Sequence, residues 1–218
     1  MLKLNRIYQG DCLTLMQDIS DNSVDCIIID PPYSTPVLTG FGRKKVLNVA
    51  DLSIQEGFFN EIRRAFGRIL KSSGRVFIFC DDRFYPILFA VFYSWKNKNL
   101  LIWNKGRIGM GNPFRKQHEL IFYVNRESFN YRRSENIKYY STVLDYSVEK
   151  NRVHPAQKPI RLLEDLILGF TDEKGLVLDC FVGSGTTAVA CKNLNRNFIG
   201  IDLSAEYCEL ARARLQNE

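Results

Sequence analysis

Short apolar runs alternate with segments of helical periodicity along most of this chain. Six runs, rich in β-branched and aromatic residues, have the length and composition of buried strands: 24–29, 75–80, 100–103, 120–124, 176–180 and 198–201. Between them, apolar residues recur at helical spacing from Phe59 to Leu70 and, after Pro159, from Leu163 to Phe170. Strands that alternate with helices predict an α/β fold, with helices on both faces of a largely parallel sheet.

Basic residues gather in one part of the chain. The 218 residues carry a net charge of +6, and the segment 96–161 alone holds 14 lysines and arginines against five acids. A surface that binds phosphates would explain this, because each neutralised phosphate releases counterions. The charge therefore favours a nucleic acid as partner, with a merely solvated surface as the alternative. The candidate phosphate contacts are Arg43, Lys44, Lys45, Arg107, Arg115, Lys116, Arg132 and Arg133.

Two stretches lack clear periodicity. We expect 34–57 to be a long loop of the kind that often carries function. The segment 126–154 is polar, basic and rich in tyrosine. We interpret the chain as one domain, 1–218, in which 126–154 is a short insertion that either reads DNA or only decorates the surface.

The cysteine pattern and the amino terminus narrow the class of protein. Six cysteines are scattered singly and only two histidines are present, so the spacing of a metal site is missing and we expect buried thiols and no metal. The chain has neither the apolar run of a signal peptide nor one long enough to span a membrane. We expect a cytoplasmic protein without a membrane partner.

The last third of the chain has the pattern of a nucleotide site. The strand 176–180 runs into a turn with Gly183 and Gly185 and then a helix, so the backbone can approach a ligand at the helix amino terminus. A second strand ends at Asp202, where nucleotide-binding folds place an acid for the ribose hydroxyls. The alternatives are a glycine turn that simply packs and a dinucleotide oxidoreductase. Only 16 residues follow Asp202, so we expect the other strands to precede this motif, in permuted order.

A second candidate site follows the strand 24–29. The residues at the carboxyl end of this strand, where α/β sheets bind their ligands, are Asp30, Pro31, Pro32 and Tyr33. Two prolines stiffen the turn, so that the carboxylate of Asp30 and the carbonyl of Pro31 can be fixed acceptors beside an aromatic ring. An amino group on a flat base needs that arrangement. The alternative is a stiff turn with no chemistry.

Together these two segments resemble the motifs of a known family. Asp30 to Tyr33 is similar to the DPPY motif of DNA amino-methyltransferases, and Phe181 to Gly185 resembles their FxGxG motif. The order of the two resembles the permuted β-class. The resemblance implies a Rossmann-like, mostly parallel seven-stranded sheet, S-adenosylmethionine as cofactor, a double-stranded DNA substrate, a flipped base and direct in-line transfer. It leaves open whether a second copy of the chain or a cognate restriction endonuclease takes part.

The resemblance also implies site residues. The catalytic segment is Asp30, Pro31, Pro32 and Tyr33. The implied cofactor-binding residues are Asp11, Cys12, Asp30, His154, Gln157, Lys158, Asp179, Phe181, Gly183, Ser184, Gly185, Thr186 and Asp202.

The resemblance leaves two candidates for the methylated group, N6 of adenine and N4 of cytosine. Aspartate at position 30 favours N6 of adenine, because the family more often pairs a serine-type motif with N4 of cytosine. An RNA base methyltransferase and a non-catalytic DNA-binding relative are further alternatives. C5-cytosine chemistry is disfavoured, because it needs a Pro-Cys nucleophile and no proline precedes a cysteine here.

Overall fold

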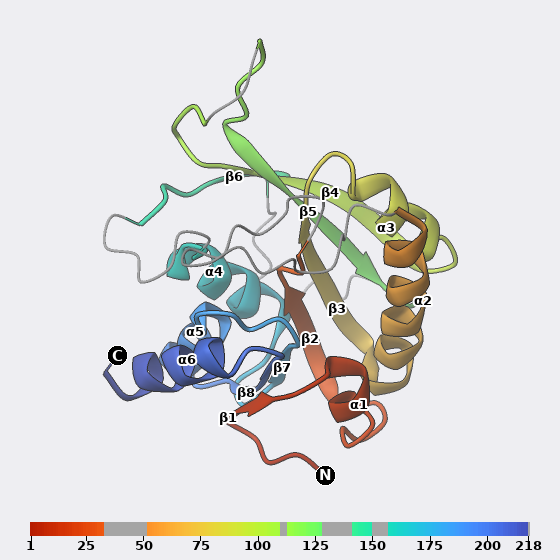
Figure 1. Ribbon diagram of the computed structural model, residues 1–218, viewed down its shortest axis with the longest axis vertical. Helices are drawn as coiled ribbons and strands as arrows, with labels where there is room; N and C mark the ends of the chain where they lie inside the picture. Colours follow the sequence, from red (N-terminus) through yellow and green to blue (C-terminus); the bar gives the residue numbers. More distant parts are fainter. Residues whose placement is uncertain (33–51, 110–112, 128–140, 150–156, 218) are drawn as a thin grey trace.

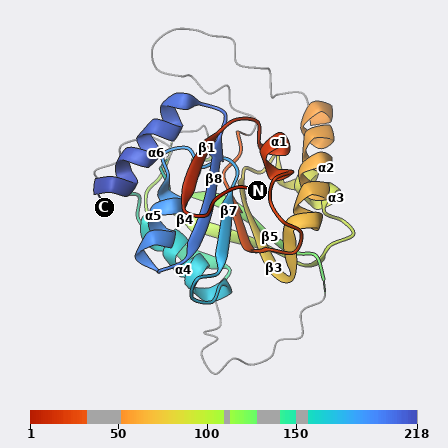
Figure 2. The same cartoon turned by 90° about the horizontal axis from the view of Figure 1, so that it is seen from below.

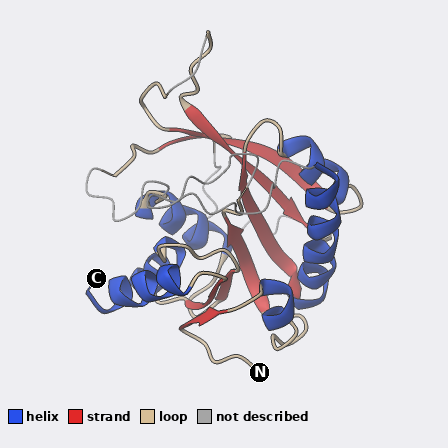
Figure 3. Cartoon of the chain, in the orientation of Figure 1, coloured by secondary structure: helices blue, strands red, loops and turns tan. Residues whose placement is uncertain are grey.

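The chain folds into three layers, with one sheet between two layers of helices (Figures 1 and 3). The structure is a computed structural model that describes residues 1–32, 52–109, 113–127, 141–149 and 157–217. The strands are β1 (Arg6–Gln9), β2 (Val24–Ile29), β3 (Leu70–Cys80), β4 (Lys96–Asn104), β5 (His118–Asn125), β6 (Val143–Asp145), β7 (Leu176–Asp179) and β8 (Asn197–Asp202). The helices are α1 (Cys12–Met16), α2 (Leu52–Ile69), α3 (Tyr85–Val91), α4 (Ile160–Phe170), α5 (Thr186–Asn193) and α6 (Ala205–Asn217).

The strands are ordered β1-β8-β7-β2-β3-β5-β4-β6. The first five in this order run parallel to one another, whereas β5 is antiparallel to both of its neighbours. The expected α/β class with a mostly parallel sheet is therefore confirmed. The expectation of a parallel strand was wrong for β5, because the chain turns straight back from β4 without a crossover helix.

The described sheet has eight strands, where the family resemblance implies seven. The additional strand, β6, lies at the sheet edge and pairs in parallel with β4. It belongs to the segment expected as an insertion, 126–154. Three residues are too few to show an alternating pattern, so this strand left no signal in the sequence.

The central strands are apolar on both faces because each face covers a separate core. In β2, Ile27 and Ile29 belong to the core beneath α1, α2 and α3, whereas Cys26 and Ile28 belong to the core beneath α4, α5 and α6. All four are buried. Figure 2 shows the strands between these two groups of helices. This burial explains why the strands read as continuous apolar runs.

Helix α2 begins earlier than the sequence predicted. We expected a loop from Ser34 to Gly57, but α2 already begins at Leu52. Gly57 lies inside the helix, and a Cβ there would meet no atom within 4 Å. An exposed glycine weakens a helix by about 1 kcal/mol relative to alanine without ending it. Residues 34–51 of the expected loop lie outside the described part of the chain.

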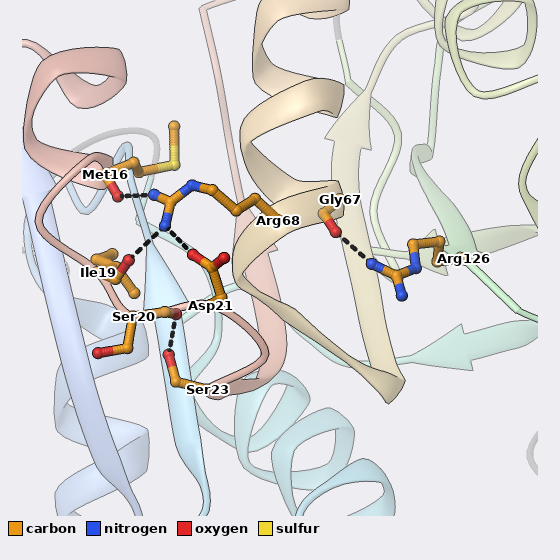
Figure 4. A network of polar contacts seen from close by, with 8 residues as sticks. All are labelled: Met16, Ile19, Ser20, Asp21, Ser23, Gly67, Arg68 and Arg126. Atoms are coloured by element: carbon orange, nitrogen blue, oxygen red, sulfur yellow. Dashed lines mark hydrogen bonds and ion pairs between the residues drawn. The ribbon is translucent and has the colours of Figure 1, made fainter.

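An arginine ties the carboxyl-terminal end of α2 to the end of α1 and the loop that follows it. Arg68, in the last turn of α2, donates to the carbonyl oxygens of Met16 (2.6 Å) and Ile19 (2.8 Å) and forms an ion pair with Asp21 (2.5 Å) (Figure 4). These bonds give the carbonyls of Met16 and Ile19, at and just after the end of α1, a charged side-chain donor. These contacts lie at the edge of the sheet where β2 begins, opposite the edge where β2 ends.

The sheet has a switch point between β2 and β7. These two strands are parallel neighbours, and Ile27 is paired with Leu178. The chain leaves β2 through α2 toward β3, but leaves β7 through α5 toward β8, on the other face and in the other direction. Ligands of open α/β sheets bind in the crevice at the carboxyl ends of such strands.

The six cysteines are all buried and unoxidised, which confirms the expectation of buried thiols. Within the described ranges, the structure contains no helix that is both long and apolar enough to cross a membrane.

Candidate active site

Asp179 organises the turn that follows β7. Its carboxylate accepts hydrogen bonds from the Phe181 N–H (3.0 Å) and from the Thr187 hydroxyl (2.5 Å) in the first turn of α5. Burial raises the pKa of this carboxyl to about 7. Asp179 therefore connects the end of the strand, the turn and the start of the helix, and it does so from inside the fold.

The two glycines of this turn have different tasks. Both have positive φ, 49° for Gly183 and 84° for Gly185, which other residues rarely adopt. A Cβ on Gly185 would lie 2.8 Å from the Cβ of Ala211, so this glycine lets α6 pack closely. A Cβ on Gly183 would meet nothing nearer than a carbonyl oxygen at 3.9 Å. The turn is therefore packed at Gly185 and open at Gly183.

Asp202 fastens the end of β8 to that turn. Its two carboxylate oxygens accept hydrogen bonds from the N–H groups of Gly183 and Ser204, both at 2.9 Å. Its side chain is half-buried, and the next residue, Leu203, is 75% exposed. Sequence reasoning missed Leu203, although a large apolar residue beside the ribose-type acid is a signal. A held carboxylate beside an exposed apolar side chain can bind a polar ligand with an apolar face.

Asp11 follows β1, and it lies near Asp202 because β1 is the neighbour of β8 in the sheet. The Gly10 N–H donates to the carbonyl of Asp202 at 2.9 Å. The Asp11 carboxylate caps α1 by accepting from both the N–H and the hydroxyl of Thr14, each at 2.8 Å. Asp11 is exposed, whereas Cys12 is buried, and a hydrogen bond with Cys180 lowers the pKa of its thiol. Of these two predicted residues, Asp11 is thus the one open to solvent.

Asp30 stands at the carboxyl end of β2, on the other side of the switch point. Its side chain is 28% exposed, and one carboxylate oxygen accepts from the Lys158 ammonium at 2.5 Å. Burial raises the pKa of the Asp30 carboxyl, and Lys158 acts in the opposite direction. Pro31 is buried and Pro32 is exposed. The first three residues of the predicted catalytic segment are thus a stiff, half-buried turn.

Lys158 has charged partners that the sequence did not predict. It was predicted as a cofactor-binding residue, and its ammonium forms ion pairs with two carboxylates, those of Asp30 (2.5 Å) and Glu119 (3.2 Å). Lys105 in turn forms an ion pair with Glu119. Neither Glu119 nor Lys105 was among the predicted site residues. A charged residue next to an apolar strand is the only signal that either gives in the sequence.

The other predicted cofactor residues are mostly inside the fold. Ser184 and Thr186 are buried, and Arg214 donates to the carbonyl of Ser184 at 2.9 Å. Gln157 is buried too, and its amide donates to Glu149 at 2.7 Å. Glu149 also accepts from the first N–H of α4, at Ile160. These predicted side chains are therefore held by hydrogen bonds within the fold.

Three predicted DNA contacts lie on the connection between β4 and β5, which projects from the molecule at the top of Figure 1. Arg107, Arg115 and Lys116 are all exposed. Arg115 donates to the carbonyl of Gly109 at 2.7 Å, and Lys116 forms an ion pair with Asp82. Phe114 on the same connection is 91% exposed. This connection presents positive charge and one aromatic ring to solvent.

Some predicted residues lie outside the described part of the chain and stay predictions. They are Tyr33, Arg43, Lys44, Lys45, Arg132, Arg133 and His154.

The residues at this edge fit a nucleoside cofactor. The open turn at Gly183, the held carboxylate of Asp202 and the exposed side chain of Leu203 provide a backbone approach, a hydroxyl acceptor and an apolar surface. A stiff acid turn stands across the switch point, after β2. A mostly parallel sheet with these parts in this order fits the class of S-adenosylmethionine-dependent methyltransferases.

The family follows from comparison with known proteins. Residues 24–213 match the model of the N6/N4 methyltransferase family, described as DNA methylase. This match covers most of the chain, including both motifs. The chain therefore belongs to the DNA methylase family.

Individual relatives agree with this. The type II methyltransferase M.HpaI of Haemophilus parainfluenzae is 29% identical over 245 residues, which cover 98% of this chain and 74% of the relative. The crystal structure of the M1.HpyAVI–SAM complex is 27% identical, with a TM-score of 0.73 and coverage of 96% of this chain and 98% of the other. The PvuII DNA methyltransferase, described as cytosine-N4-specific, shares the fold with a TM-score of 0.77 at 16% identity, over 95% and 85% of the two chains.

Proposed function

We propose that this protein methylates the exocyclic N6 of adenine in a specific sequence of double-stranded DNA, with S-adenosylmethionine as the methyl donor. The observation that carries the proposal is the half-buried Asp30, held by Lys158 at the switch point of the sheet, next to the glycine turn of β7. Family membership supports the reaction class, and the residues at the sheet edge support the roles given below.

The cofactor would be bound by the edge of β7, β8 and β1. Asp202 uses one lone pair on each oxygen for a backbone N–H, so each oxygen keeps capacity to accept from a ribose hydroxyl. Leu203, which is 75% exposed, would cover the adenine ring of the cofactor, and Asp11 would face its polar edge. When bound, S-adenosylmethionine supplies a methyl group on a positively charged sulfur.

Asp30 would bind the amino group that receives the methyl group. The nitrogen of an aromatic amine is a poor nucleophile, because its lone pair is shared with the ring. A fixed carboxylate and the carbonyl of Pro31 can accept its two hydrogens and orient the lone pair. The carboxylate also stabilises the positive charge that grows on the nitrogen, and this effect is larger in the transition state than in the ground state. Tyr33 would stack on the base.

DNA would be held by positive charge around this edge. The projecting connection with Arg107, Arg115 and Lys116 supports this role, and Arg43, Lys44, Lys45, Arg132 and Arg133 are proposed from the sequence alone. A base inside a duplex cannot reach a carboxylate at the end of a strand, so the target must be flipped out. Flipping costs a few kcal/mol, which contacts to the backbone must offset.

The choice of base is tested by labelled methyl transfer. Duplex DNA is incubated with the protein and tritiated S-adenosylmethionine, digested to nucleosides and separated. We expect the label in N6-methyladenine. Label in N4-methylcytosine would overturn the choice of base while keeping the chemistry. The absence of label in DNA, with a protein that binds the cofactor, would contradict the function.

A further inference from the structure

Four charged side chains of alternating sign form a row that ends at Asp30. Lys105 follows β4 and pairs with Glu119, at the start of β5. Glu119 lies 3.2 Å from the ammonium of Lys158, which precedes α4, and Lys158 lies 2.5 Å from the carboxylate of Asp30. Segments far apart in the sequence therefore meet in one ion-pair row. The proposed function uses only its last two members, Lys158 and Asp30.

Both lysines of the row contact the face of an aromatic ring. The ammonium of Lys158 is 4.9 Å from the centre of the Phe79 ring, and that of Lys105 is 5.1 Å from the Trp103 ring. These two rings are themselves buried and packed edge to face, with centroids 6.4 Å apart. Little water can reach this side of the row, so the charges interact more strongly than they would at the surface.

The neighbouring charges in the row shift the pKa values of Glu119 and Lys158 more than burial does. Burial alone would raise the pKa of Glu119, but Lys158 and Lys105 outweigh it and lower the pKa. Burial would lower the pKa of Lys158, but Asp30 and Glu119 outweigh it and raise the pKa. Both groups are therefore held in the charged form. Lys158 is also shared between two carboxylates, so its positive charge is not directed at Asp30 alone.

The consequence for Asp30 is geometric. Lys158 holds one of its oxygens, Oδ2. The other oxygen accepts no hydrogen bond within the ranges that the structure describes and is the one left for an amino group. If Lys158 were free to move, the carboxylate could rotate and offer either oxygen. Glu119 opposes that movement, because its Oε2 forms an ion pair with the same ammonium.

We propose that Glu119, through Lys158, is a positioning residue for the methyl-transfer reaction, which keeps Asp30 oriented and available as an acceptor. This inference rests on the proposed function of Asp30. Lys105 completes the row by neutralising Glu119. None of the three residues needs to touch the base or the cofactor for this role.

The role predicts opposite shifts in the pH dependence of kcat. Asp30 must be ionised to accept a hydrogen from the base, so activity falls on the acidic side as pH drops through its pKa. Lys158 lowers the pKa of Asp30, and Glu119 raises it by repulsion. The acidic limb should therefore move to higher pH in Lys158→Gln and to lower pH in Glu119→Gln. Among the residues that the structure describes, the charged or titratable groups that act on Asp30 or are acted on by it are Lys158, Glu119, Lys105, Asp179 and Cys80.

The experiment compares kcat, KM for DNA and pH profiles of the wild type, Glu119→Gln, Glu119→Asp and Lys158→Gln. The matched control is Lys71→Gln, which breaks the partly buried Lys71–Asp25 pair (2.7 Å) at the other end of β2. We expect Glu119→Gln to lose roughly tenfold or more in kcat with little change in KM, as for a misplaced catalytic group. Glu119→Asp should recover part of the rate and the wild-type position of the acidic limb. Lys71→Gln should change thermal stability only.

A second readout does not depend on activity. Carbon-13 labelling of aspartate carboxyls, with the Asp30 signal assigned by its loss in Asp30→Asn, reports the pKa of Asp30 by NMR titration. It should fall in Glu119→Gln and rise in Lys158→Gln. If the wild type is active but Glu119→Gln matches Lys71→Gln in rate and leaves the Asp30 titration unchanged, the positioning role is wrong. A wild type that methylates no DNA instead overturns the proposed function, and this inference with it.

Discussion

At the scale of single residues, Asp202 shows how one carboxylate can serve both the fold and a ligand. The N–H groups of Gly183 and Ser204 fix its two oxygens in place. A ligand hydroxyl then meets an acceptor that loses no further side-chain freedom on binding, which favours affinity. Asp81, at the end of β3, accepts from the N–H groups of Arg83 and Phe84 in a similar way.

Replacing Asp202 with alanine should weaken cofactor binding by about 1.5–3 kcal/mol, the range for hydrogen bonds to a charged group. The measurement is isothermal titration with S-adenosylhomocysteine. Asp81→Ala is the control, because it removes a comparable backbone-capping carboxylate from a different strand end and should leave the affinity as it is. Unchanged affinity in Asp202→Ala would contradict the assignment to the ribose.

Asp179 makes folding stability depend on pH. Its pKa, raised to about 7 by burial, exceeds that of an unfolded aspartate, so the folded state binds the extra proton between about pH 4 and 7. The stability from this group is present below about pH 4 and is lost as pH rises through 7. Asp179→Asn should therefore gain in melting temperature, relative to the wild type, between pH 5 and pH 8. Parallel curves for the two proteins would contradict the raised pKa.

Site residues could be predicted from the sequence where a motif marks them. They could not be predicted where the role depends on an ion pair with a distant segment. Asp30, Gly183 and Asp202 stand at strand ends, and a strand end can be read from the apolar run before it. Glu119 and Lys158 are far apart in the sequence, and only the tertiary fold brings the two side chains together as an ion pair. Periodicity cannot reveal such a pairing, because it carries no information about which strands are neighbours.

At the scale of elements, the connection between β4 and β5 combines positive charge with an exposed ring. Ile108 and Phe114 are 60% and 91% exposed, and Arg107 lies between the strand end and Ile108. Exposed apolar side chains on a basic projection have no role in the core. They suit contact with bases or with the sugar edge of a DNA groove.

Arg107→Gln should therefore reduce the slope of log affinity against log salt by about one phosphate contact, measured with duplex DNA at several salt concentrations. Phe114→Ala should weaken binding with little change in the slope, because it carries no charge. Arg126→Gln is the control, since this arginine belongs to the same basic segment but donates to the carbonyl of Gly67 inside the protein (Figure 4). Equal slopes for Arg107→Gln and Arg126→Gln would show that the projection does not contact phosphate.

Elements with a strong pattern were predicted, and those set by tertiary packing were not. The six apolar runs are all strands, and the stripe after Pro159 is α4. The start of α2 was missed because the apolar stripe that predicted this helix begins only at Phe59. Strand β6 was missed because an edge strand of three residues is defined by its partner β4. The direction of β5 depends on the turn before it, which the apolar pattern does not encode.

At the scale of the whole molecule, the sheet collects the predicted parts on one edge. The ends of β1, β8, β7 and β2 are adjacent in the sheet although they are spread over most of the chain. The permuted motif order therefore does not alter the geometry, because the same neighbours meet whichever motif comes first. The projecting connection is carried by β4 and β5 at the far side of the same sheet.

The central claim is that Asp30 accepts the amino group during methyl transfer to DNA. It is tested most directly by single-turnover transfer with saturating cofactor and duplex DNA, for the wild type and Asp30→Ala, with a cofactor titration and a thermal melt of both. Losing a preorganised electrostatic partner should lower the rate by about 10²–10³ or more, while cofactor affinity stays within roughly tenfold. A folded Asp30→Ala protein that transfers methyl groups at nearly the wild-type rate would contradict the account.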